Sequence, residues 1–146
     1  MEYTKNNRGV LKGFEGATPI EPNELITADV DILIPAALQN AITLELAPDV
    51  KAKLIVEGAN GPVVPEADEI LSDKGIIIVP DILANGGGVT VSYFEWVQNK
   101  YGHYWSEDEV NEKHDNSMNA AFESIWAKAE EYKTTLRLGA YITALK

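Results

Sequence analysis

The stretch Asp81–Asn99, DILANGGGVTVSYFEWVQN, decides the fold of this 146-residue chain. Apolar residues run into Asn85 and three glycines, and a segment with helical character follows, so we expect a strand that leads into a helix over Gly88–Lys100. Glycine has no Cβ, so these glycines can take positive φ and let a ligand approach the main chain closely. The first turn of the helix would offer N–H groups to an electron-rich ligand. The pattern therefore predicts a ligand platform.

Three short, mostly β-branched runs predict the strands of a sheet: Val30–Ile34, Leu54–Val56 and Ile76–Val79. They are apolar without alternation, which is typical of parallel strands covered on both faces. The other predicted helices are Pro22–Thr27, Ile42–Leu46, Pro65–Asp73, Glu107 to about Tyr132 and Leu136–Leu145. We therefore expect an α/β fold, a partial doubly wound (Rossmann-like) parallel sheet of about three strands with C-terminal helices. Residues 1–146 would form one domain, with a β-α part over about 19–86 and a helical part over about 87–146.

The long predicted helix after Trp105 carries two further signals. Ser106 and Glu109 have the spacing of a capping box, which places the start of the helix at Glu107. Further along, one face repeats apolar residues at helical spacing, which predicts a packing surface made of Met118, Ala121, Phe122, Ile125, Trp126 and Ala129.

Composition excludes several classes of partner and chemistry. The formal charge of −11 disfavours nucleic acids and anionic membranes, because both require a positive surface. No run approaches the ~18 apolar residues of a membrane span, and the start, MEYTKNNRGV, lacks the apolar stretch of a secretory signal. The chain has no cysteine, which excludes disulfides and thiolate metal sites and fits a reducing, cytoplasmic location.

The candidate site lies where the predicted strands end, because ligands of open α/β sheets bind outside the carboxyl ends of the strands. The first strand is followed by Ala36 and Ala37, the second by GANGP with Asn60, and the third by Asn85. Small residues would leave a shallow floor for a flat ring or a phosphate, and carboxamides donate and accept hydrogen bonds. Alternatively, Asn60 is a turn residue that tolerates left-handed geometry, and the alanines let a helix pack closely.

Conventional catalytic groups are scarce, so we predict no catalytic residue and no metal site. His103 and His114 have no metal-ligand partner at useful spacing. Ser92 has no adjacent base, so its hydroxyl is better suited to binding an anion than to nucleophilic attack. The sequence contains neither GxGxxG nor a P-loop, the usual phosphate-binding devices.

Nearly the whole chain resembles glutamate dehydrogenases of the Glu/Leu/Phe/Val dehydrogenase family. Three blocks carry the resemblance. They are DILIPAALQNAIT, VEGANGPVVPEADEIL, and VPDILANGGGVTVSYFEWVQN followed by YWSEDEV. The resemblance implies the later part of an NAD- or NADP-binding domain, in a homo-oligomeric enzyme that oxidatively deaminates L-glutamate to 2-oxoglutarate and ammonia. It assigns Ala36, Ala37, Asn60 and Asn85 to the cofactor, and Val89 and Ser92 to the substrate.

The chain departs from the family pattern in ways that bear on function. Gly86 stands where alanine is usual, and Val63 and Val64 stand where Thr-Thr is common. The family's catalytic lysine and aspartate, and its GxGxxG turn, belong to segments outside this sequence, so the chain alone is expected to be inactive. Half of the usual sheet would also be missing, which leaves an edge at the first strand that invites another chain. The alternatives are a non-catalytic nucleotide-binding or interaction module and a purely structural role.

Overall fold

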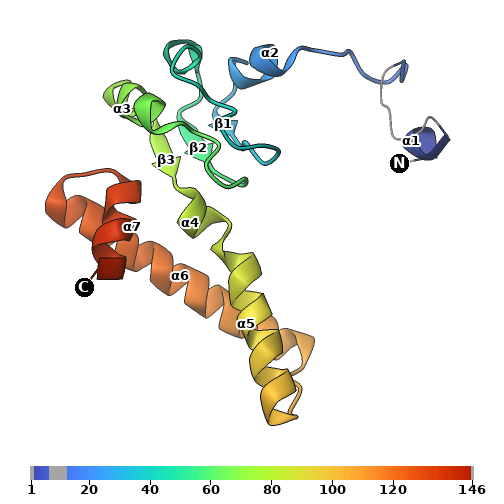
Figure 1. Cartoon of the computed structure of the whole chain (residues 1–146), viewed down its shortest axis with the longest axis vertical. Coiled ribbons are helices and arrows are strands. Elements are labelled where there is room, and N and C mark those ends of the chain that lie inside the picture. Colours follow the sequence, from blue (N-terminus) through green and yellow to red (C-terminus); the bar gives the residue numbers. More distant parts are fainter. Residues whose placement is uncertain (1, 7–12, 146) are drawn as a thin grey trace.

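A parallel three-stranded sheet lies at the centre of the computed structural model, which describes residues 2–6 and 13–145. Its strands β1 (Ile32–Leu33), β2 (Leu54–Val56) and β3 (Ile77–Val79) lie in the order β1-β2-β3 (Figure 1). Ile55 is in register with Leu33 on one side and with Ile78 on the other. The predicted α/β fold with about three parallel strands is confirmed, and only β2 has the predicted bounds.

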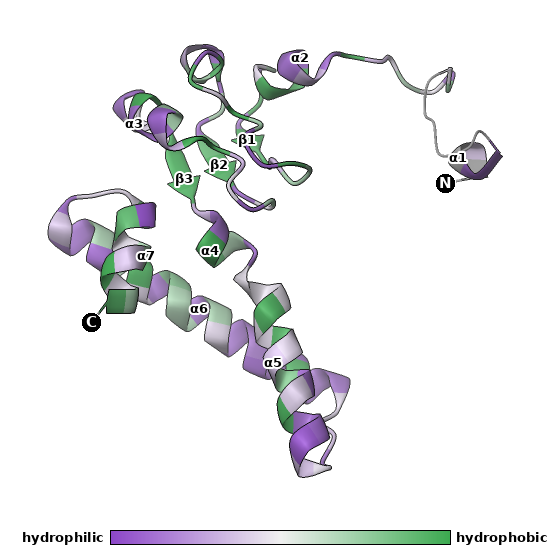
Figure 2. Ribbon diagram, in the orientation of Figure 1, coloured by the Kyte–Doolittle hydropathy of each residue, from purple (hydrophilic) through white to green (hydrophobic). Residues whose placement is uncertain are grey.

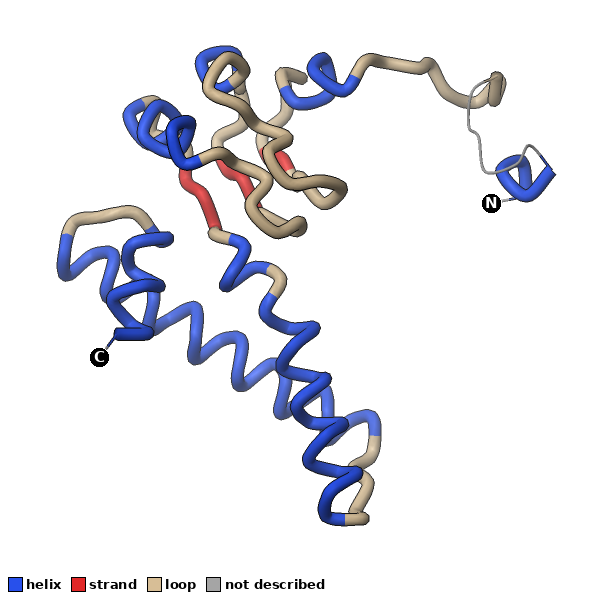
Figure 3. The backbone as a smooth tube through the Cα atoms, in the orientation of Figure 1, coloured by secondary structure: helices blue, strands red, loops and turns tan. Residues whose placement is uncertain are grey.

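Helices account for most of the remaining elements (Figure 3). They are α1 (Glu2–Asn6), α2 (Pro22–Ile26), α3 (Pro65–Asp73), α4 (Asp81–Ala84), α5 (Gly86–Tyr101), α6 (Glu107–Tyr132), α7 (Leu136–Leu145) and the 3-10 helix η1 (Ala47–Asp49). The expected capping box is present, because Ser106 Oγ accepts from the Glu109 amide at 3.3 Å and Glu109 Oε2 accepts from the Ser106 amide at 2.8 Å. α3 starts at Pro65, whose fixed φ suits a first helical position.

Two local predictions are wrong. Residues 42–46 form no helix in the structure, since Ile42 makes a parallel bridge with Val63. Its amide donates to the Pro62 carbonyl at 2.8 Å, and its carbonyl accepts from the Val64 amide at 3.1 Å, so pairing with a distant segment overrides the local helical signal. The third strand ends at Val79, as predicted, but it does not run directly into Asn85, because α4 intervenes.

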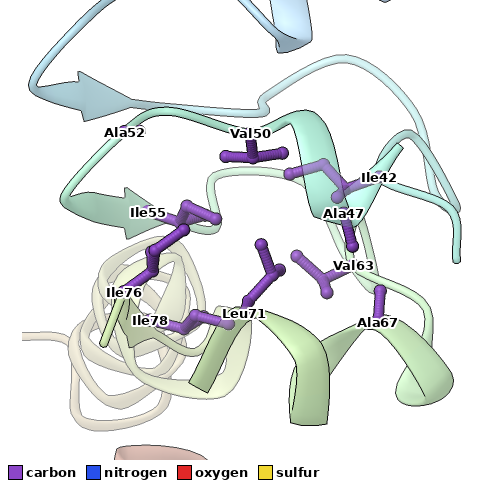
Figure 4. Close-up of a cluster of buried hydrophobic side chains, with 10 residues drawn as sticks. All are labelled: Ile42, Ala47, Val50, Ala52, Ile55, Val63, Ala67, Leu71, Ile76 and Ile78. Atoms are coloured by element: carbon purple, nitrogen blue, oxygen red, sulfur yellow. The ribbon is translucent and has the colours of Figure 1, made fainter. Parts of the chain in front are cut away.

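The main core lies between the sheet, α3 and the loop before β2, and the strands are among the most hydrophobic segments (Figure 2). Ile42, Ile55 and Leu71 are completely buried there. Figure 4 shows all members of this cluster: Ile42, Ala47, Val50, Ala52, Ile55, Val63, Ala67, Leu71, Ile76 and Ile78.

A second, smaller cluster joins the helices, and consists of Leu83, Ile125, Ala129, Leu136 and Ala140. Ile125 and Ala129 therefore pack as predicted. Phe122 and Trp126 belong to the same predicted face, but more than a third of the surface of each remains exposed. Beyond this cluster, α5 and α6 pack against each other and run away from the sheet as a two-helix arm (Figure 1).

Candidate functional site

A hollow of about 660 Å³ opens at the carboxyl ends of the strands. It is lined by Ala36, Ala37, Leu38, Gln39, Gly58, Ala59, Asn60, Asn85 and Val89. All three predicted strand exits therefore meet at one place, as expected for a parallel sheet. The Ala59 amide donates to the Pro35 carbonyl at 2.9 Å, which ties the second exit to the first.

Two asparagine side chains meet at the hollow. Asn85 Nδ2 donates to Asn60 Oδ1 at 2.7 Å and lies 3.4 Å from the Gly58 carbonyl oxygen. A carboxamide carries two donor hydrogens and an acceptor oxygen, so this pairing leaves most of the hydrogen-bonding capacity of both side chains for a ligand. The sequence places these residues 25 positions apart, and the sheet brings them into contact.

Small residues are required where the first two exits touch. A Cβ added at Gly58 would lie 3.0 Å from the Ala36 Cβ and 3.4 Å from its Cα. Larger side chains at either position would push the two loops apart or fill the hollow. Close packing is therefore one reason for the small residues here, and it is compatible with a ligand lying on them.

The glycines after Asn85 do not use the positive φ that glycine allows. Gly86, Gly87 and Gly88 have helical backbone and form the first turn of α5. A Cβ at Gly87 would lie 2.6 Å from His114 Nε2, so glycine lets α6 approach this turn. The segment after Asn85 is therefore the start of a helix and not a left-handed turn.

The two predicted substrate residues lie on one face of α5. Val89 lines the hollow and is 71% exposed. Ser92 is exposed one turn further on, at the i+3 position from Val89, and lies outside the residues that line the hollow. The structure therefore brings Ala36, Ala37, Asn60, Asn85 and Val89 together and leaves Ser92 at the margin.

A partly buried charged cluster lies next to the loops that form the hollow, and sequence reasoning missed it. The Arg137 guanidinium of α7 donates to Glu57 Oε1 at 2.8 Å and to Asp68 Oδ2 at 3.1 Å, and lies 3.5 Å from Asp81 Oδ1. Glu57 is completely buried, although it directly follows an apolar strand. A charged residue in that position was the one available signal, because charges are rarely buried without a partner.

The cluster also fixes the main chain beside the site. Glu57 Oε2 accepts from the Asp81 amide at 2.7 Å, and Asp81 Oδ2 accepts from the Gly61 amide at 2.8 Å. Burial alone would lower the pKa of the Arg137 guanidinium, but its hydrogen bonds with Glu57 and Asp68 outweigh burial and raise that pKa above its ordinary value. The guanidinium therefore stays charged and holds three carboxylates in place.

A larger hollow, of about 800 Å³, lies beside β3 and the turn between α6 and α7. Its charged lining includes Asp68 and Arg137, which are already paired with each other. It shares no lining residue with the hollow that holds the asparagine pair, and for that reason we place the candidate site at the smaller hollow. Among the described residues, no group of three or more His, Cys, Asp or Glu side chains is arranged to hold a metal ion. Nor does the described part contain a helix long and apolar enough to cross a membrane.

Parallel strands with a hollow across their carboxyl ends define an open-sheet α/β protein of the ligand-binding class. The chain belongs to the Glutamate/Leucine/Phenylalanine/Valine dehydrogenase family, whose model matches residues 1–146. It is 56% identical over its whole length to the NAD-specific glutamate dehydrogenase of Clostridioides difficile and 49% identical to that of Peptoniphilus asaccharolyticus. It spans 34% of each of these curated relatives, about a third of their length.

Solved structures agree with this assignment. The crystal structure of glutamate dehydrogenase from Peptoniphilus asaccharolyticus matches with a TM-score of 0.72 and 53% identity, over 76% of this chain and 28% of that one. The leucine-bound hetero-hexameric glutamate dehydrogenase from Thermus thermophilus matches with a TM-score of 0.83 and 35% identity, over 90% of this chain and 32% of that one.

Proposed function

We propose that this chain forms one wall of the cofactor and substrate cleft of an NAD- or NADP-dependent glutamate dehydrogenase. The observation that carries the proposal is the contact of 2.7 Å between Asn85 Nδ2 and Asn60 Oδ1 at the strand ends. Family membership supports it, and the relatives quoted above are named as NAD-specific glutamate dehydrogenases. The reaction would convert L-glutamate to 2-oxoglutarate and ammonia.

The proposed roles follow from what each residue presents to the hollow. The side chains of Ala36 and Ala37 are only methyl groups, so a flat ring or a phosphate of the dinucleotide can lie against that loop. Asn60 and Asn85 would orient the dinucleotide through their remaining donors and acceptors. Val89 would pack on the substrate side chain, and the Ser92 hydroxyl would meet its distal carboxylate from the next turn of α5. When bound, the nicotinamide cofactor supplies the hydride chemistry, and the chain supplies orientation.

Titration of the 146-residue chain with NAD tests the cofactor site. We expect chemical-shift changes at the Asn60 and Asn85 carboxamides, and we expect Asn60→Ala and Asn85→Ala to weaken binding. Asn119→Ala is the matched control, because Asn119 is exposed on α6, away from the hollow. Binding that is unchanged in both site variants would refute the assignment.

The affinity separates this proposal from its rivals. A part of a larger dinucleotide site should bind at about millimolar concentration or weaker, whereas a self-sufficient nucleotide-binding module should reach about micromolar affinity. A purely structural role predicts that NAD does not bind at all. Millimolar binding that is lost on substitution of the asparagines is the result we expect.

We predict that the 146-residue chain alone does not oxidise glutamate. The side chains that line its hollow include no general acid or base, and proton transfer by such groups typically contributes about 10²–10⁴-fold to a rate. The measurement is NADH or NADPH formation by chain purified from a host that lacks its own glutamate dehydrogenase. Turnover in that preparation would contradict the prediction.

We further propose a homo-oligomeric state and a cytoplasmic location, the latter in keeping with the absence of cysteine.

A further inference from the structure

Asp81 has contacts on both sides of the asparagine pair. Its Oδ2 atom accepts from the Gly61 amide at 2.8 Å, and Gly61 directly follows Asn60. Its own amide donates to Glu57 Oε2 at 2.7 Å, and it is the first residue of α4, the short helix that ends just before Asn85. One residue therefore touches the loop that carries Asn60 and starts the helix that places Asn85.

The bond to Gly61 restrains a residue with left-handed backbone. Gly61 has a φ of +55°, and a Cβ built there would meet no heavy atom of the described residues within 4 Å. Gly61 itself makes no side-chain contact, although the next residue, Pro62, is fully buried. Two hydrogen bonds hold the polar groups of Gly61, one from its amide to Asp81 and one from the Asn40 amide to its carbonyl at 2.8 Å.

Arg137 fixes the carboxylate that makes this bond. The guanidinium lies 3.5 Å from Asp81 Oδ1, while its other nitrogens donate to Glu57 and Asp68. The Ile82 amide also donates to Asp81 Oδ1 at 2.8 Å, which leaves Oδ2 directed at Gly61. Arg137 itself lies outside the residues that line the hollow.

We propose that Asp81, held by Arg137, is a positioning residue that sets the mutual geometry of the Asn60 and Asn85 carboxamides. The role of that geometry in binding NAD rests on the proposed function. The geometric part stands on the contacts of Asp81 alone. Neither Asp81 nor Arg137 needs to touch the ligand, since both act through the main chain at Gly61 and α4.

Two matched variants test the proposal in the 146-residue chain. Asp81→Ala and Asp68→Ala each remove one carboxylate that contacts Arg137, but only Asp81 holds the Gly61 amide. Nitrogen-edited NMR of the ligand-free chain would follow the Gly61 amide and the Asn60 and Asn85 carboxamides. We expect these signals to move in Asp81→Ala and to stay in place in Asp68→Ala. If Asp81→Ala does not fold, Asp81→Asn, which loses one of the two acceptor oxygens, takes its place.

Titration with NAD supplies the second readout. We expect affinity to fall about threefold to tenfold in the Asp81 variant, the equivalent of one net hydrogen bond, and to be unchanged in Asp68→Ala. Carboxamide signals that stay in place in the Asp81 variant, or that move equally in both variants, would overturn the positioning role. A wild-type chain whose carboxamide signals do not respond to NAD would refute the proposed cofactor site instead, and the ligand-free spectra would still decide the positioning.

Discussion

Val63 and Val64 follow each other in the chain but have different environments. Val63 is a buried member of the main core, whereas Val64 is partly buried and packs against that core. Val64 is also the N-cap residue of α3, with extended backbone, and valine has no oxygen to accept from the first helical amides. We expect Val64→Thr to raise the free energy of unfolding by about 0.5–1 kcal/mol, because a threonine hydroxyl can cap the helix. Urea unfolding of the two proteins measures the difference.

Val63→Thr is the control for this prediction, since it makes the same chemical change one residue earlier. Val63 is 6% exposed, so its replacement would bury a hydroxyl and lower the free energy of unfolding by about 1–3 kcal/mol. Opposite signs for the two variants support the cap. Equal loss of stability in both would show that Val64 acts as a core residue.

Single residues also show what sequence reasoning reaches at the site. The meeting of Asn60 and Asn85 followed from one rule, that parallel strands end at the same edge of a sheet. The contact of Glu57 with Arg137 did not follow from any rule of that kind. The two residues lie 80 positions apart, and an arginine near the start of a predicted helix resembles any surface cation. The sequence does not show how α7 packs, so it does not show that Arg137 is mostly removed from solvent.

At the scale of elements, the start of α6 carries a prediction about pH. Hydrogen bonds from the Ser106 amide and hydroxyl hold the pKa of Glu109 below its ordinary value. A lowered pKa in the folded state means that this contribution to stability is full above the ordinary pKa and is lost as the pH falls through the lowered one. We therefore expect Glu109→Gln to destabilise the protein at neutral pH, and the difference from wild type to shrink in acid.

The measurement is urea unfolding of both proteins at neutral pH and below the ordinary glutamate pKa of about 4.3. Glu112→Gln is the control, because Glu112 is an exposed residue of the same helix outside the capping box. A difference for Glu109→Gln that persists unchanged in acid would contradict the electrostatic origin of the cap.

The crossing of α6 and α7 depends on Gly139. A Cβ at this position would lie 2.8 Å from the Ile125 carbonyl oxygen and 3.1 Å from the Ala129 nitrogen, both backbone atoms that cannot move alone. We expect Gly139→Ala to cost about 1–3 kcal/mol of unfolding free energy, because the two helices must separate. Gly86→Ala is the matched control, since a Cβ there meets no heavy atom of the described residues within 4 Å. Equal thermal stability of the two variants would contradict this account.

Elements with strong local signals were predicted well, and those that depend on distant partners were not. Proline at the start of α3 and the capping box at α6 gave helix starts that the structure confirms. The helix predicted at residues 42–46 is wrong because Ile42 pairs with Val63, a partner that the local pattern does not contain. The sequence left the backbone of Gly86 and Gly87 open, since glycine allows positive φ without requiring it, and the structure places both in the first turn of α5.

At the scale of the whole molecule, the described residues form two separate hydrophobic clusters, one under the sheet and one between the helices. The sequence pattern shows which apolar residues lie on the same face of an element. It does not show which hydrophobic cluster each of them joins. Along the chain, the exit of β3, α4 and the start of α5 connect the two parts (Figure 1), and α7 also packs against β3. The candidate site lies near that connection, and the ion pairs of Arg137 add a second one, because they tie α7 to Glu57 after β2 and to Asp68 of α3.

The edge of the sheet gives the last prediction. β1 is an edge strand of the described sheet, and Ile32 and Ile34 in and beside it are 54% and 60% exposed. An apolar edge of this kind invites pairing with another chain, so we expect the 146-residue chain to form dimers or larger species as its concentration rises. Ile32→Lys should shift the population towards monomer, because a charge on an edge strand opposes pairing.

Leu145→Lys is the control, because it places the same charge on an exposed leucine of α7 and should leave association unchanged. Light scattering over a concentration series measures the mass, and a strictly monomeric wild-type chain at high concentration would contradict the prediction.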